Sequence, residues 1–160
     1  MKTHHRLLAA CAAFLFTVSL LPLRAGAAEL VARRIDIQFD TLDSGKAPAT
    51  SVTVLVEDGN GLVAAKYDFA RGVAFAGNTN SPEFVVPIIR GPITAGDLRA
   101  FKVTIQMHAA SGQTDTWRFN HVLRAHMSNG GVITREAQHC GLKSVGGGMA
   151  GVSREFQGHS

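Results

Sequence analysis

The chain has 160 residues, 46% of them hydrophobic, with 16 Lys and Arg against 12 Asp and Glu. Three of the basic residues (Lys2, Arg6 and Arg24) precede residue 28, so the remaining 133 residues hold 13 basic and 12 acidic residues. A domain this close to neutrality gives no reason to propose a nucleic-acid partner, since phosphate binding depends on surplus positive charge. Its length suits a single domain with one hydrophobic core.

The first 27 residues have the pattern of an export signal. Met1–Arg6 is a short basic start, Leu7–Leu23 is an almost uncharged apolar stretch, and Arg24–Ala28 supplies small residues for cleavage. We predict cleavage after Ala27, a periplasmic or extracellular location, and no membrane span once the signal is removed. A lipoprotein signal ending at Cys11 is the alternative, but too few apolar residues lie between Arg6 and that cysteine.

Alternating apolar and polar residues predict β-strands through most of the remaining chain. The clearest prediction is a hairpin, in which residues 52–57 and 62–69 flank the turn Asp58-Gly59-Asn60-Gly61. Further strands are expected at residues 35–39, 84–89, 101–107, 117–127 and 132–136. No long helical period is present after the signal.

About seven to eight short strands joined by Gly, Asn and Pro turns predict an all-β fold, an antiparallel β-sandwich over residues 28–137. The glycine-rich segment 138–160 is expected to be a flexible tail. Within it, Gly146–Gly151 matches a dinucleotide-binding pattern, but only nine residues follow and no βαβ unit surrounds it. Cys140 is the only cysteine beyond the signal, so an intramolecular disulfide is ruled out and pairing with another chain stays open.

In two of the expected strands, the alternate positions that point outward carry polar residues, and none of these polar residues is acidic. The candidate ligand-binding residues on these strands are Lys102, His108, Arg118, Asn120, Arg124 and His126. If the two strands pair, these residues form a basic stripe able to hold anionic lipid head groups or acidic glycans. The alternative is a solvated face balanced by acidic residues on nearby loops.

No catalytic or metal motif emerges from the remaining polar residues. His121 shares its parity with Trp117, Phe119 and Leu123, which favours a hydrogen-bonded core histidine over a metal ligand. Oxygen ligands for calcium occur at Asp40, Asp43, Ser44, Asp58 and Asn60, but their spacing fits no defined calcium loop and turn formation explains them. We therefore expect no cofactor, with calcium disfavoured, and lean away from an enzyme.

The segment Ile93–Leu98, the strand Phe101–Ile105 and the sequence Asp115-Thr116-Trp117 resemble the C-terminal half of PLAT/LH2-like domains. The resemblance rests mainly on residues 93–127 and extends over 33–128. It implies an eight-stranded β-sandwich that binds membrane lipid or a protein partner, with calcium in some members. In this resemblance, Trp117 corresponds to the family's tryptophan at the start of the last strand, where its role is packing and not ligand contact. The family's Thr-Asp pair before the second strand is replaced by Thr50-Ser51, which makes calcium less favoured.

These observations predict a secreted or periplasmic, non-catalytic binding module that contacts anionic lipid surfaces or a protein partner. A carbohydrate-binding module is the alternative, and it requires Trp117 or Tyr67 to be exposed for stacking on sugars. A small secreted hydrolase is the third hypothesis, and it requires a cleft with two carboxylates or a Ser–His pair.

Overall fold

The computed structural model describes residues 28–69 and 72–157, so the predicted signal segment 1–27 lies outside the described residues. The regular secondary structure of the described chain is β-strand, apart from one 3-10 turn. In chain order its elements are β1 (Ala32–Thr41), β2 (Ser51–Glu57), β3 (Val63–Phe69), β4 (Thr79–Asn80), β5 (Phe84–Val85), the 3-10 turn η1 (Asp97–Arg99), β6 (Ala100–His108), β7 (Thr114–Met127), β8 (Val132–Val145) and β9 (Met149–Gln157).

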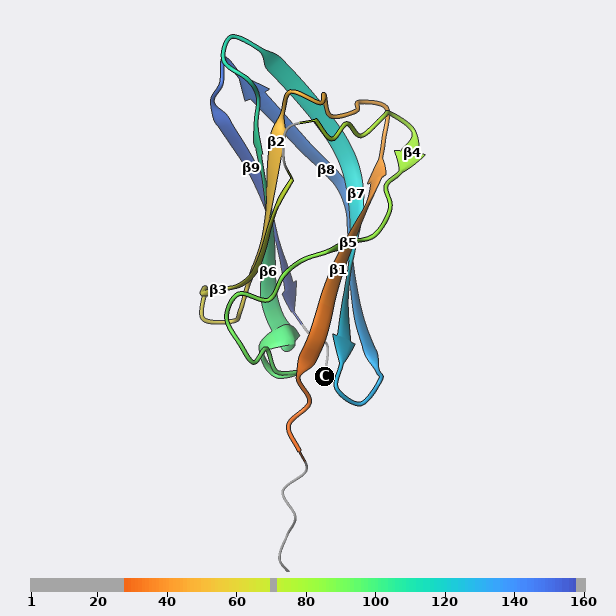
Figure 1. Cartoon of the computed structure of the whole chain (residues 1–160), viewed down its shortest axis with the longest axis vertical. Coiled ribbons are helices and arrows are strands. Elements are labelled where there is room, and N and C mark those ends of the chain that lie inside the picture. The colour runs from red at the N-terminus through yellow and green to blue at the C-terminus, as the bar shows by residue number, and fades with distance from the viewer. Residues whose placement is uncertain (1–27, 70–71, 158–160) are drawn as a thin grey trace, which may run out of the picture.

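The strands form two sheets that pack face to face (Figure 1). One sheet has the order β4-β1-β7-β8, with β5 also paired to β1, and the other has the order β3-β2-β6-β9. All pairings are antiparallel. The prediction of an all-β antiparallel sandwich is therefore confirmed. Across residues 28–69 and 72–157, no helix has the length and apolar character needed to cross a membrane.

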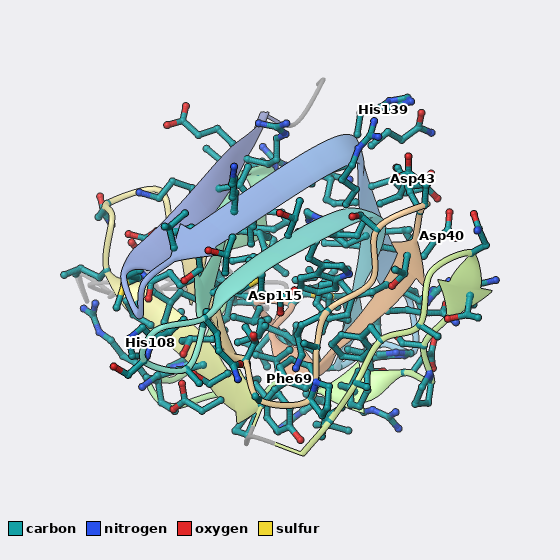
Figure 2. All side chains as sticks on the ribbon, turned by 90° about the horizontal axis from the view of Figure 1, so that it is seen from above. Asp40, Asp43, Phe69, His108, Asp115 and His139 are labelled. Atoms are coloured by element: carbon teal, nitrogen blue, oxygen red, sulfur yellow. The ribbon has the colours of Figure 1, made fainter. Side chains whose placement is uncertain are left out.

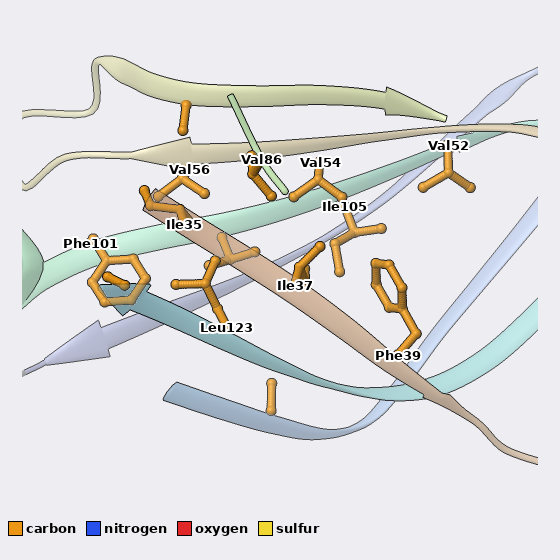
Figure 3. Close-up of a cluster of buried hydrophobic side chains, with 14 of the residues drawn as sticks. Ile35, Ile37, Phe39, Val52, Val54, Val56, Val86, Phe101, Ile105 and Leu123 are labelled. Atoms are coloured by element: carbon orange, nitrogen blue, oxygen red, sulfur yellow. The ribbon is translucent and has the colours of Figure 1, made fainter. Parts of the chain in front are cut away.

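The core lies between the sheets and follows from the period-two alternation of the strands (Figure 3). Successive side chains of a strand point to opposite faces, so every second residue of β1 reaches the core: Ile35, Ile37 and Phe39 are all 0% exposed. The corresponding residues of β2 and β6 face them from the other sheet. The hydrophobic effect over this shared interior holds the sheets together.

The predicted hairpin of β2 and β3 is also confirmed. Its six paired positions flank a turn in which one carboxylate oxygen of Asp58 accepts the backbone N–H groups of Asn60 at 2.8 Å and Leu62 at 3.0 Å. Gly61 has φ of 78°, a left-handed conformation that glycine adopts without a steric penalty. Asp58 therefore fixes the turn, as its residue type indicated.

The prediction of a flexible tail from residue 138 is wrong for the described part of that segment. β8 continues to Val145, and β9 pairs with β6 over nine positions. The expected strand at 132–136 is the first part of β8, and a β-bulge hides the rest in the sequence. The bulge lies at Gln138 and His139, where His139 has φ of 55°, so the core-facing residues change from the alternation of Ala137 to that of Cys140. The glycines at 146 and 147, with φ of 63° and 86°, form the turn between β8 and β9.

The apolar run 84–89 forms a strap between the sheets rather than one strand. Phe84 and Val85 pair with β1, and three residues later Ile88 bridges to Ala65 of β3. Pro87 lies between these contacts, and its carbonyl accepts the N–H of Lys66 at 3.0 Å. The strap thus connects the β1 sheet with the edge of the β3 sheet.

A buried lysine joins two loops at one end of the sandwich. Lys46 is 2% exposed, and its ammonium group donates to the backbone carbonyls of Ala47 at 2.9 Å, Thr50 at 2.6 Å and Val73. All three of its protons are therefore used. Burial lowers the pKa of Lys46, and the carboxylate of Asp115 opposes that effect.

We predict that Lys46→Met lowers the free energy of unfolding by about 2–4 kcal/mol, because three carbonyl groups lose their donor in a buried site. Urea unfolding followed by fluorescence of Trp117 measures the change. Lys66→Met is the matched control, since the side chain of Lys66 forms an exposed ion pair with Asp68 at 2.9 Å and its backbone hydrogen bond is unaffected by the substitution. Equal urea midpoints for the two variants would contradict the role assigned to Lys46.

Candidate functional site

The six residues proposed from sequence do not form one stripe. Lys102 and His108 lie on β6, whereas Arg118, Asn120, Arg124 and His126 lie on β7. These strands belong to different sheets, because the connection between them crosses the sandwich instead of forming a hairpin. Seen from above, His108 lies on the opposite side of the molecule from Asp40, Asp43 and His139 (Figure 2). The proposed stripe is therefore corrected to two separate sets.

The β7 set is balanced by acidic neighbours. Arg118 donates to Asp43 at 2.7 Å, and Arg124 donates to Glu83 at 2.6 Å. Asn120 donates to Asp40 at 2.9 Å. The structure thus matches the alternative of a solvated face whose charges are neutralised locally, and such exposed pairs contribute little binding energy for an external anion.

His126 takes part in a partly buried network on the same face. The carboxylate of Asp36, only 1% exposed, accepts from Arg34 Nε at 2.7 Å and lies 2.9 Å from His126 Nε2. A buried carboxylate requires such partners, because removing its charge from water is costly. His126 therefore has a structural role on the β1–β7 surface.

The β6 set is also engaged within the fold. Lys102 forms an ion pair with Glu57 of β2 at 3.0 Å. His108 Nε2 donates to the carbonyl of Gly147 in the β8–β9 turn. His108 thus helps to position a segment that the sequence analysis assigned to a tail.

The β8–β9 turn is the functional candidate that the sequence analysis missed. Val145 and Met149, at the two ends of the three-glycine turn, are 58% and 70% exposed. Beneath them the buried hydroxyl of Ser144 accepts the N–H of Ala109 at 2.9 Å and donates to the carbonyl of Gly148. The N–H of Gly146 donates to the backbone carbonyl of Gln113 at 2.9 Å. The available signal was the pair of apolar residues that flanks the glycines.

This turn lies at one end of the sandwich together with three other loops (Figure 1). We call this region the hairpin end after the β8–β9 hairpin, and the β2–β3 hairpin lies at the opposite end. The hairpin end comprises residues 42–50, 72–78, 109–113 and 146–148. Asp43 and Lys46 are the only charged residues in these described ranges, and Lys46 is buried. The hairpin end is therefore formed mainly by small, uncharged residues.

The opposite end of the sandwich is polar. It contains the β2–β3 turn and the segment 90–97, and we call it the Asp58 end (Figure 1). A hollow of about 240 Å³ lies there, with Asp58, Asn60, Arg90 and Asp97 among its lining residues. Asp97 accepts the N–H of Thr94 at 2.8 Å and its hydroxyl at 2.9 Å. The two carboxylates thus stabilise their own loops.

The aromatic residues proposed for sugar stacking are not presented to solvent as a platform. Trp117 is 0% exposed and stacks on Phe119 with ring centroids 4.0 Å apart. Tyr67 is partly buried and contacts Phe69 edge to face at 4.5 Å. Trp117 therefore packs in the core, and stacking on a sugar at this residue is ruled out. The expectation that Trp117 opens the last strand is wrong, because β8 and β9 follow β7.

His121 and Cys140 form a buried pair between the sheets. Both are 1% exposed, and Cys140 Sγ lies 3.9 Å from His121 Nδ1. Burial and the nearby Arg154 lower the pKa of His121 to about 4, and burial raises the pKa of Cys140. Both groups are neutral at pH 7, so the thiol lacks the thiolate character of a reactive cysteine and is inaccessible to a second chain.

The potential calcium ligands are also separated. Asp40 and Asp43 lie on or beside β1 and bond to Asn120 and Arg118, whereas Asp58 lies at the Asp58 end. In residues 28–69 and 72–157, no three His, Cys, Asp or Glu side chains are arranged to hold a metal ion.

Comparison with protein-family models, with curated proteins and with solved structures finds no match to this chain. The fold itself defines the class, a two-sheet antiparallel β-sandwich with one loop end that carries few charged residues and one polar loop end.

We predict that the stability of the protein falls as the pH is lowered from about 6.5 to about 4. His121 takes up a proton near pH 6.5 in the unfolded chain but near pH 4 in the folded protein, so acid favours unfolding. The loss approaches about 3 kcal/mol at the lower limit. Urea unfolding across this pH range measures it.

His121→Leu should remove most of this pH dependence, whereas His139→Gln, at an exposed histidine, should retain it. An unchanged pH dependence in His121→Leu would show that other groups cause the loss.

Proposed function

We propose that this chain is an exported, non-catalytic binding module that contacts a lipid surface through the hairpin end of its sandwich. The observation that supports this function best is the exposure of Val145 and Met149 at the β8–β9 turn. Exposed apolar side chains on a projecting turn gain free energy when they enter an apolar medium. The resemblance to PLAT/LH2-like domains points to the same class of partner.

The anchoring of the turn strengthens this proposal. Ser144, His108 and the backbone of Gln113 hold the turn against the neighbouring loop. Because the turn is already ordered, contact with a surface requires little further loss of conformational entropy. A glycine-rich segment that was disordered would lose most of its binding energy to that ordering.

The charge distribution favours the hairpin end over the sheet faces. Few charged groups must lose water there, since Lys46 is already buried and Asp43 is paired with Arg118. Lys143, an exposed residue two positions before Val145, adds attraction toward anionic head groups. On the sheet faces, Lys102, Arg118 and Arg124 are already paired with acids.

We favour a lipid surface over a protein as the partner of the hairpin end. Two described hollows lie at the opposite end, beside Asp58. Lipid chains adapt to a projecting turn, whereas a protein partner must supply a complementary pocket. Burial of two half-exposed side chains contributes roughly 2–3 kcal/mol, so we expect weak and reversible binding.

We predict that the protein co-sediments with vesicles, more strongly with anionic than with neutral lipid, and that calcium or a chelator has no effect. The double variant Val145→Ser/Met149→Ser should lower the partition coefficient at least tenfold, because the apolar contribution is lost. Negligible pelleting of the unchanged protein in every condition would overturn the lipid proposal.

The matched control is Val132→Ser/Leu62→Ser, which removes two apolar residues of similar exposure, 50% and 46%, away from the hairpin end. This variant should pellet like the unchanged protein. An equal loss in both double variants would show that general surface hydrophobicity, and not the β8–β9 turn, causes binding.

A further inference from the structure

The hollow at the Asp58 end contains charges of both signs from separate segments. Asp58 and Asn60 come from the β2–β3 turn, Arg90 follows the strap, and Asp97 begins η1. Pro92 and Ile93 supply part of the apolar lining. The volume of about 240 Å³ corresponds to roughly eight water-sized groups, which is the size of a small polar molecule.

Both carboxylates are held in place while keeping an oxygen available. Asp58 Oδ1 and Asp97 Oδ2 each accept two hydrogen bonds from their own loops. Among the described residues, no hydrogen bond reaches Asp58 Oδ2 or Asp97 Oδ1. The Leu62 and Asn60 amides and the Arg90 charge lower the pKa of Asp58, so that its carboxylate is ionised at neutral pH.

Arg90 is close to this carboxylate but does not bond to it. Its Nη1 lies 3.9 Å from Asp58 Oδ2, beyond hydrogen-bond distance, and its side chain is 55% exposed. The guanidinium group therefore keeps its donors for an external acceptor. A cationic and an anionic group thus stand side by side with their hydrogen-bonding capacity unused.

We propose that this hollow binds an α-amino acid. The ammonium group of the ligand contacts Asp58 and Asp97, and its carboxylate contacts the planar guanidinium of Arg90, which suits two-point binding of a carboxylate. The two ligand charges are separated by one carbon atom, and this short spacing matches the adjacent opposite charges of the hollow. The site is independent of the hairpin end, which lies at the other end of the sandwich (Figure 1).

Titration of the purified protein with L-alanine, followed by NMR shifts of the Asn60, Leu62 and Asp97 amides, tests this proposal. We expect saturable shifts confined to the Asp58 end. N-acetyl-L-alanine lacks the ammonium group and L-alaninamide lacks the carboxylate, so each should bind at least tenfold more weakly. Absence of saturable shifts with L-alanine, or equal shifts with N-acetyl-L-alanine, would overturn the proposal.

Two variants test the residues. Arg90→Gln and Asp97→Asn should each weaken L-alanine binding at least tenfold, and Asp97→Asn keeps a side-chain oxygen as acceptor for Thr94. Asp43→Asn is the control, because it alters an exposed carboxylate at the hairpin end and should leave the affinity unchanged. Equal affinity in Arg90→Gln and the control would overturn the site. Vesicle pelleting of Arg90→Gln and Asp97→Asn should equal that of the unchanged protein, because both residues lie at the opposite end from the hairpin end, so the result is separate from the lipid proposal.

Discussion

The packing of Trp117 is the interaction on which the rest of the structure depends. Its indole ring lies between Phe119 and Phe75 and beside Phe39, and its Nε1 donates to Thr41 at 3.3 Å. These contacts join β7, β1 and the loop that contains Phe75. Stacked aromatic rings add specific geometry to the burial of a large apolar area. The loops of the hairpin end are therefore supported from within the core.

Three of the sheet edges, at β3, β8 and β9, carry a feature that discourages pairing with another chain. The strap at Pro87 and Ile89 hydrogen-bonds to the edge of β3, and the bulge at His139 interrupts β8. On β9, Arg154 pairs with the buried Val103 of β6, so its side chain leaves the sheet on the same side as that of Val103, and it lies beside Cys140. An inward-pointing charge and a bulge are known ways to block edge-to-edge association. Recognition by strand addition is thus unfavourable at these three edges.

The two loop ends have different chemistry because different residues close them. At the hairpin end, backbone groups and buried side chains such as Lys46 and Ser144 satisfy one another, which leaves apolar side chains outward. At the Asp58 end, Asp58 and Asp97 stabilise the loops. Each uses one carboxylate oxygen for its own loop and keeps the second oxygen available. Turn stabilisation thus creates an apolar surface at one end and a charged hollow at the other.

The period-two alternation in β1, β2, β6 and β7 was sufficient to predict the strands, the β2–β3 hairpin and the buried position of His121. These features depend on local geometry, since a strand places alternate residues on opposite faces. The bulge at His139 could not be seen in the pattern, because an extra residue reverses the alternation. The part of β8 beyond the bulge was missed for that reason, whereas β9 was missed because the glycines before it resemble a flexible tail.

The candidate stripe from Lys102 to His126 failed for a related reason. The sequence by itself determined which residues point outward from β6 and β7, since that property belongs to each strand alone. Only the tertiary structure decided that the two strands lie in different sheets, that their cations meet acids from β1, β2 and nearby loops, and that the glycines after Val145 form an anchored turn. Those outcomes depend on contacts between residues far apart in the chain, which a local pattern of residue types does not encode.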